Sequence, residues 1–566
     1  MTNGLVALDY TAIGIYLALM AGIGGILGMY VKNVKEYFAG GNAVPWHLGA
    51  ISNYMTMIST FVFVAHAGVV YKDGLFGLLL LWSPVPATLF ATIFLAHRWR
   101  RAGLVTPVEY LEQRYGASVR QIISWGGVGF RILDNMVRLY ALGIFVSGTL
   151  GCSMNQAIAV SGGIVIVYTM IGGVWAVVVT DAIQCAILLM ITTVLVPLAL
   201  TAVGGFGSLA TAIPTHFHWL NGSKGGLWFL FVYYLIVLIK YNGNWAFVQR
   251  FYCMKDERAA WKMGVMSAVL FSLFPLIFML PAFAATVLIP NLANPEEAYV
   301  SVCKMLLPPG AMGLMIAAML SATMSTLRGE YNVTASVVTR DIYRRLLRPN
   351  AENREQMIVA RLATVALGTV IVFGAMQVGR FGGAFEANKM LTGLIGVPLA
   401  APLMFGMLWR RPRPWGVMAS IIIGIASGLI LNGIPGLSWQ SATFGQILVC
   451  LGILIVSGLR ESRCAEYRQR VTEFFNRLAI PVRESEETGD GASRGHRAIM
   501  ILFAVSLGLS GLLFVGISLF SVALRSGQYA LVAGLWCCSV AALLGWRLRK
   551  SRSSLRQVPQ RGNEKC

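Results

Sequence analysis

Apolar stretches separated by short polar connections run along almost the whole chain. About fifteen of them are long enough to cross, as α-helices, a hydrocarbon core roughly 30 Å thick. Several exceed the length that a bilayer requires, so we expect those helices to tilt, break or project into water. The pattern predicts an all-α polytopic membrane protein with spans at about 9–31, 46–71, 75–97, 118–151, 155–178, 180–203, 226–251, 262–290, 311–344, 357–379, 386–409, 414–432, 441–459, 497–522 and 528–547.

Composition and charge agree with this prediction and add an orientation. Hydrophobic residues make up 57% of the 566 residues and charged residues only 12%, unlike a soluble protein. If the N-terminus is outside, few of the 45 Lys and Arg residues fall in outward loops, as the positive-inside rule requires. We therefore expect an integral protein of the plasma (inner) membrane with its N-terminus outside and its C-terminus cytoplasmic. The outward cations are then Lys72, Lys224, Lys304, Arg380, Lys389 and Arg525.

The net charge of +21 follows from this topology and from attraction to anionic membrane lipid, so it requires no nucleic-acid partner. Residues 461–496 form a long polar stretch on the cytoplasmic side. Its first half could form an amphipathic surface helix, and its second half resembles a flexible linker. The stretch is too short for a catalytic domain but could bind an unidentified partner. Because no nucleophile elbow, zinc motif or phosphate-binding loop is found in the sequence, we do not expect an enzyme.

Five groups of local motifs carry a resemblance to a known family. In their order along the chain they are similar to the signatures of the sodium/solute symporter family, over about residues 36–435. The resemblance implies secondary transport of a small-molecule solute with the sodium ion as coupling ion. The motifs are "EYFAGGNAVPWHLGAIS" (36–52), "TPVEYLEQRYG" (106–116), "GGVWAVVVTDAIQ" (172–184), "QRFYCMKDERAAWKM" (249–263), and "AAMLSAT" with "TRDIYRR" (317–345).

The fold that the resemblance implies is a LeuT-type core of ten helices in two inverted five-helix repeats, with one extra helix before the core and four after it. The first helix of each half is interrupted by small or polar residues, in "GAISNYMTMIST" and "IKYNGNW". Such interruptions leave free carbonyls and helix ends at mid-membrane, where ligands bind. The expected parts are an N-terminal helix and cytoplasmic loop (1–45), the two repeats (46–203 and 226–432), an extra helix (433–460), the polar linker (461–496), and two extra helices with a basic tail (497–566).

The resemblance also implies a sodium site between the first and eighth core helices. Its ligands are hard oxygens: the main-chain carbonyls of Met55, Ile58 and Ala322, and the hydroxyls of Ser325 and Thr326. The alternative is that both hydroxyls bond back to carbonyls one turn earlier in their own helix, as Ser and Thr often do in membranes. We favour the sodium site because the alternative does not explain why both hydroxyls arrive in register.

Arg328 interrupts the same apolar helix, where an unpaired cation costs at least a few kcal/mol. By the resemblance, some members hold a second sodium here with an aspartate that matches Asp181, but Arg328 and Gly329 occupy the places of the hydroxyls. One hypothesis is that the guanidinium of Arg328 replaces that ion and pairs with Asp181. The other is that Arg328 extends to the inner headgroups.

Further charges within the predicted spans indicate the chemistry of the solute. Arg131, Asp134 and Arg138 share one face of the third core helix by their spacing, while Lys240 and Asn244 lie in the interrupted sixth helix. Three cations and one carboxylate at a substrate-binding site favour an anionic or zwitterionic substrate, such as a carboxylate or an amino acid. By the resemblance, sugar-transporting members carry an aromatic residue in place of Lys240, which disfavours a sugar. The alternative is that these charges only satisfy one another.

Three functions remain open on the sequence. The first is sodium-coupled transport, which the paired hydroxyls favour. The second is sodium-independent transport, driven by protons or by exchange, with Asp134 and Asp181 as candidate proton carriers. The third is a solute sensor built on a transporter fold, signalling through 461–496 or the tail. The sequence shows no fused kinase or receiver domain, which weakens the third.

Overall fold

The computed structural model describes residues 5–28, 44–170, 174–219, 226–460, 462, 464–482 and single positions between 508 and 543. Within these ranges the regular structure is helical, apart from an isolated β-bridge between Val44 and Met254. The predicted all-α class is therefore confirmed. Most of the predicted spans 497–522 and 528–547, the basic tail, and the second half of the 461–496 stretch lie outside the described residues.

The first half of the bundle contains a helix that is broken near its middle. α3 ends at Met57, and the helix that resumes at Val62 and runs through α4 is bent by 60° from it. Between them Ile58 is extended, with φ −102° and ψ 119°. The interruption predicted in "GAISNYMTMIST" is confirmed. The helices of this half are α3 (Trp46–Met57), α4 (Ala67–Asp73), α5 (Leu75–Trp82), α6 (Pro84–Phe90), α7 (Ala96–Arg101), α8 (Glu109–Tyr115), α9 (Ala117–Leu150), α10 (Met154–Met170) and α11 (Val174–Ala202).

The second half contains a matching break between α13 and α14, which are bent by 52°. A Cβ added to Gly243 would lie 2.5 Å from the Cα of Ala400, so glycine allows the break to lie directly against α20. The interruption predicted in "IKYNGNW" is also confirmed. The helices are α12 (Phe206–Ala212), α13 (Gly226–Asn242), α14 (Trp245–Tyr252), α15 (Glu257–Leu288), α16 (Ala298–Leu306), α17 (Ala311–Val337), α18 (Asn353–Ala375), α19 (Ala384–Leu391) and α20 (Val397–Leu408).

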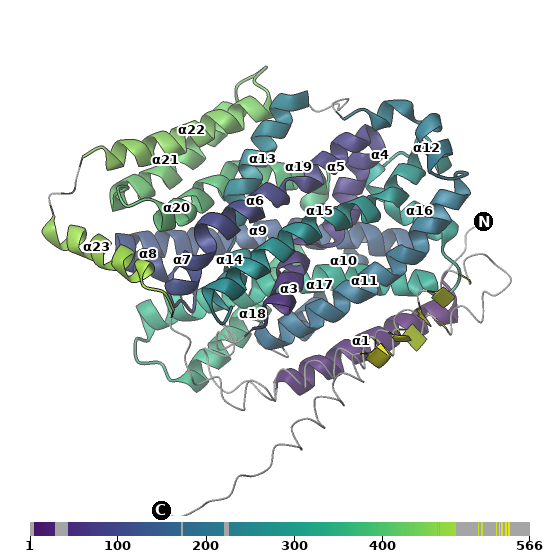
Figure 1. Ribbon diagram of the computed structural model, residues 1–566, viewed down its shortest axis with the longest axis horizontal. Helices are drawn as coiled ribbons and strands as arrows, with labels where there is room; N and C mark the ends of the chain where they lie inside the picture. Colours follow the sequence, from purple (N-terminus) through teal and green to yellow (C-terminus); the bar gives the residue numbers. More distant parts are fainter. Residues whose placement is uncertain are drawn as a thin grey trace, which may run out of the picture.

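The helix α17 lies at the centre of the bundle (Figure 1), and all of its residues from Ala311 to Val337 are buried. It packs against α3, α9, α11 and α1 (Ala7–Gly28). Its sequence is rich in Ala, Ser, Thr and Gly, which let helix backbones approach closely in a membrane. The polar side chains of α17 therefore face other helices and not lipid.

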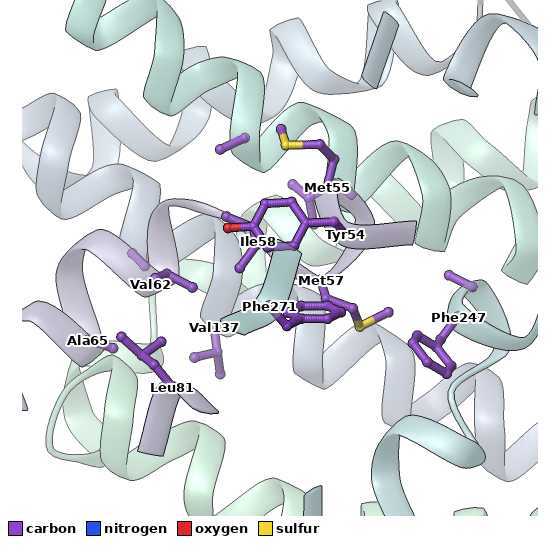
Figure 2. Packing of buried hydrophobic residues seen from close by; sticks show 14 of the residues in the cluster. Tyr54, Met55, Met57, Ile58, Val62, Ala65, Leu81, Val137, Phe247 and Phe271 are labelled. Atoms are coloured by element: carbon purple, nitrogen blue, oxygen red, sulfur yellow. The ribbon is translucent and has the colours of Figure 1, made fainter. Parts of the chain in front are cut away.

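Apolar side chains enclose the break after α3. Figure 2 shows Tyr54, Met55 and Ile58 beside the break, with Phe271 of α15 nearby. The rings of Tyr54 and Phe271 have centroids 5.0 Å apart. This packing removes water from around the freed carbonyls of α3, which strengthens any electrostatic interaction that they make.

Within the described part of the chain, eight helices are individually long and apolar enough to cross a membrane. Three bent pairs meet the same test together, α3 with the helix from Val62, α9 with α10, and α13 with α14. The length and composition of these helices indicate an integral membrane protein. The total of fifteen spans stays a prediction.

Further helices surround the core. α21 (Pro414–Asn432) and α22 (Trp439–Gly458) lie side by side along one edge, while α1 lies along another (Figure 1). The amphipathic helix predicted in the polar stretch is α23 (Ala465–Ala479). Its Phe474 stacks on Tyr110 of α8 at 5.7 Å, and Arg101 of α7 donates to the carbonyl of Leu478 at 2.9 Å. α23 is therefore fastened to the ends of the core helices.

Candidate functional site

The break after α3 directs main-chain carbonyls at a hydroxyl of α17. The Oγ1 of Thr326 lies 2.8 Å from the carbonyl oxygen of Ile58, 3.2 Å from that of Met55 and 3.1 Å from that of Ala322. A hydroxyl has one hydrogen to donate, so it cannot satisfy three acceptors. Three buried carbonyl oxygens that converge beside a hydroxyl are the donor set by which broken membrane helices hold sodium. The residues present fit a sodium ion.

Ser325, the fifth expected ligand, has its hydroxyl turned to a different partner. Its Oγ donates to Oδ1 of Asp181 on α11 at 2.6 Å, and Ser52 of α3 donates to the other carboxylate oxygen. Ser325 therefore does not bond back to its own helix, whereas Thr326 bonds back to Ala322 and also reaches α3. The structure brings four of the five expected ligands together at one point and connects the fifth to Asp181.

Arg328 forms neither of the two interactions that the sequence suggested. It is 1% exposed, so it does not extend to headgroups. Its Nη1 donates to Oγ1 of Thr180 at 3.1 Å, and its guanidinium lies 4.5 Å from the ring centroid of Tyr168. The ion pair of Asp181 is instead with Arg250 of α14, whose Nη2 lies 3.8 Å from Oδ2. Arg328 lies almost one turn beyond Ser325, and stacking on Tyr168 directs it to the residue next to Asp181.

Asp134 on α9 accepts bonds from its own helix and from two other helices. Arg138, one turn along α9, donates to Oδ2 from Nη2 at 2.9 Å. Lys240 of α13 approaches Oδ1 at 3.1 Å, and the amide of Asn388 on α19 donates to the same atom at 3.0 Å. Lys240 also donates to Oγ1 of Thr392 at 2.9 Å. The expected residues Asp134, Arg138 and Lys240 thus form one connected cluster.

Arg131 belongs to a second cluster, around a carboxylate that the sequence analysis missed. Its Nη1 lies 2.9 Å from Oε2 of Glu330 on α17, and its guanidinium lies 4.9 Å from the ring centroid of Trp245. Asn244, which caps the start of α14, donates to the other oxygen of Glu330 at 2.9 Å. The expectation of three cations against one carboxylate was therefore wrong, because Glu330 balances Arg131.

A signal for Glu330 was available in the sequence. It lies two residues after Arg328 in an apolar helix, and a buried acid at such a position requires a partner on another helix. Arg131 was the cation without an assigned carboxylate. Asn388 and Thr392 gave no comparable signal, because a polar side chain in a bundle is most often satisfied by its own helix.

A small cavity of about 90 Å³ lies between the two broken helices. Arg138, Lys240 and Asn244 line it together with Asn388 and Lys389. A smaller cavity of about 20 Å³ is lined by Arg131 and shares Lys240 and Asn244 with the first. The volume is below the roughly 300 Å³ at which small-molecule sites begin, so helices must separate to admit a solute. The larger cavity is also lined by the apolar residues Met57, Ile58, Phe61, Val62, Leu81, Pro84, Phe271 and Pro275.

Comparisons with known proteins agree with this geometry. The sodium/glucose cotransporter of Vibrio parahaemolyticus is 25% identical over 76% of this chain and 86% of its own length. The osmoregulated proline transporter of Bacillus subtilis is 26% identical over 74% of this chain and 87% of its own. A solved Na⁺-coupled sialic acid symporter superposes with a TM-score of 0.72 at 21% identity, covering 80% of this chain and 98% of that one.

The last likeness shows the fold, and the LeuT-type architecture that the sequence predicted is confirmed. The model of the sodium:solute symporter family matches residues 37–424, well over half of the chain. Sodium as the coupling ion and the expectation of a transporter follow from this match. The chain belongs to the sodium:solute symporter family.

Proposed function

We propose that this sodium-coupled transporter takes up a small organic anion or zwitterion that carries a carboxylate. The observation that carries the proposal is the sign of the groups that face the cavity. Arg138, Lys240 and Lys389 line the cavity, whereas Asp134 and Glu330 lie behind it with side chains only 2% and 1% exposed. The solute therefore meets cations first, although buried acids balance most of the charge.

The apolar residues that line the cavity limit the class of solute further. A sugar presents hydroxyls on all sides, and each needs a partner when it leaves water. Here apolar side chains, among them Leu81, Pro84 and Phe271, make up much of the lining beside the charged groups. This arrangement suits a carboxylate with a short apolar portion. Among the relatives, proline and sialic acid carry a carboxylate, whereas glucose does not.

The proposed sodium site and the cavity share one short segment of chain, which supplies a physical route for coupling. Met55 and Ile58 offer their carbonyls toward Thr326, and Met57 and Ile58 also line the cavity. An ion held by these carbonyls fixes the end of α3 against α17. It thereby sets the wall that the solute contacts, so that binding of one favours binding of the other.

The test is the sodium-dependent thermal stabilisation of the purified protein, with choline replacing sodium at constant ionic strength. A ligand that binds only the folded state raises apparent stability with its occupancy. We expect sodium to stabilise the wild type and Thr326→Ser, which keeps the hydroxyl, but not Thr326→Ala. If Thr326→Ala keeps the full effect while folded, the sodium site does not lie at these residues.

A second arm tests the solute class with sodium present throughout. Small carboxylates and amino acids are compared with glucose for added stabilisation, in the wild type and in Lys240→Gln. We expect a carboxylate to stabilise the wild type and to lose the effect in Lys240→Gln, while stabilisation by sodium persists. Stabilisation by glucose alone would contradict the proposed solute class.

A further inference from the structure

Helix α22 lies outside the ten helices that the resemblance assigns to the core, yet its first residue reaches the central cavity. Trp439 lines this cavity together with residues of both broken helices. We propose that Trp439 forms the outer wall of the solute cavity and selects, with Lys389, what enters it. The inference deepens the proposed function and rests on it for the identity of the cavity as the solute site.

The start of α22 is fixed in place by α13, the helix that carries Lys240. The indole of Trp228 on α13 donates to Oγ of Ser441 at 3.1 Å. The rings of Phe229 and Trp439 have centroids 5.4 Å apart. The N-cap residue Ser438 accepts from the main-chain N–H of Ser441. Because these contacts hold the first turn of α22 against α13, Trp439 is held at the edge of the cavity.

Trp439 also holds a cation at this edge. The Nζ of Lys389 lies 5.1 Å from the centroid of a Trp439 ring, and Lys389 pairs with Glu386 one turn earlier on α19. A cation over an aromatic face gains about 1 kcal/mol or more when it is partly removed from water. The indole therefore keeps Lys389 at the cavity, with its side chain 14% exposed.

The indole also lies beside the π-helical segment Thr392–Gly396 that follows α19. A Cβ added to Gly393 would lie 3.6 Å from Nε1 of Trp439, so the ring lies about one methyl group away from this glycine, next to the cavity-lining residue Thr392. Removing the ring would take away this part of the cavity lining. An anion with an apolar portion would contact both the Lys389 ammonium and the indole, whereas a cation would be repelled.

The experiment measures access to the cavity and requires no knowledge of the solute. Ser83, which lines the cavity, is replaced by cysteine, and reconstituted full-length protein is treated with a membrane-impermeant, negatively charged methanethiosulfonate. Mass spectrometry of the peptide containing residue 83 separates this label from native cysteines. The rate is measured for Ser83→Cys alone and with Trp439→Ala, Trp439→Phe or Trp415→Ala. Trp415 is a matched control, because this tryptophan lies on α21, is 49% exposed and is outside the residues that line the cavity.

Cysteine reactivity follows exposure, so we expect Trp439→Ala to raise the rate about tenfold or more, and Trp439→Phe and Trp415→Ala to change it by less than about twofold. An unchanged rate in Trp439→Ala, or an equal increase in Trp415→Ala, would overturn the proposal. Sodium-dependent stabilisation of each variant confirms folding. Failure of the proposed function would appear separately, as absent stabilisation by carboxylates in a protein whose labelling still depends on Trp439.

Discussion

Glu330 connects three helices with one carboxylate. It lies on α17 and accepts from Arg131 of α9 and from Asn244 at the start of α14. It is 1% exposed, so its charge has lost nearly all contact with water. A buried charge is tolerated only where partners satisfy it, and removing one partner leaves the other uncompensated. Glu330 thus positions both Arg131 and the break between α13 and α14.

Replacing Glu330 with alanine is expected to lower the free energy of unfolding by about 3 kcal/mol, because Arg131 would remain buried without its partner. Thermal or denaturant unfolding in detergent measures the change. Glu466→Ala is the control, since Glu466 pairs with Arg470 on α23 but is 80% exposed, and its loss should cost less than about 0.5 kcal/mol. If both substitutions lower the free energy of unfolding equally, the buried pair stabilises the protein no more than the exposed pair does.

The residues around the proposed sodium site and Asp181 differ in how far the sequence could place them. Ser325 and Thr326 were placed by the resemblance to the family's motifs in this helix. The partner of Arg328 was not predictable, because it depends on how α17 is rotated against α10 and α11. That rotation puts Tyr168 and Thr180 beside the guanidinium. The partner of Asp181 is likewise set by α14, whose Arg250 enters from another part of the chain.

At the scale of elements, the two broken helices were predictable because small and polar residues interrupt long apolar stretches. The docking of α1 was not, although Asp9 was visible in the sequence. Oδ1 of Asp9 accepts from the main-chain N–H groups of Gly310 and Gly313, at 2.8 and 2.7 Å. An acidic group there satisfies the free donors at the start of α17 and complements the helix dipole. A cap supplied by another helix leaves no pattern near the capped sequence.

Asp9→Ala is expected to destabilise the protein by about 1–2 kcal/mol, the cost of losing a strong N-cap. Asp9→Asn should cost less, because its amide oxygen still accepts from the same donors. The measurement is the unfolding midpoint in detergent. Thr11→Ala serves as control, since its exposed hydroxyl bonds only to the carbonyl of Ala7 in the same helix. If Asp9→Ala behaves like Thr11→Ala, α1 is not held to α17 by this cap.

At the scale of the whole molecule, buried cations lie where helices of the two halves meet. Arg250 and Arg328 are fully or almost fully buried and approach Asp181 and its neighbour Thr180. Two guanidinium groups in this volume repel any further cation, since charges in a poorly solvated interior interact strongly. The place near Asp181 is therefore filled by side chains that cannot leave during transport. Among the described residues, the carbonyls beside Thr326 form the site that we propose for an exchangeable sodium ion.

This arrangement predicts that one sodium ion binds per protein. Above the dissociation constant, each tenfold rise in sodium adds about 1.4 kcal/mol of stability for every ion bound only to the folded state. Unfolding free energies are measured over a sodium series in which choline keeps the ionic strength constant. We expect the single-ion slope in the wild type and no slope in Thr326→Ala. A slope of twice this size would mean that a second ion binds despite Arg250 and Arg328, and that these arginines do not replace it.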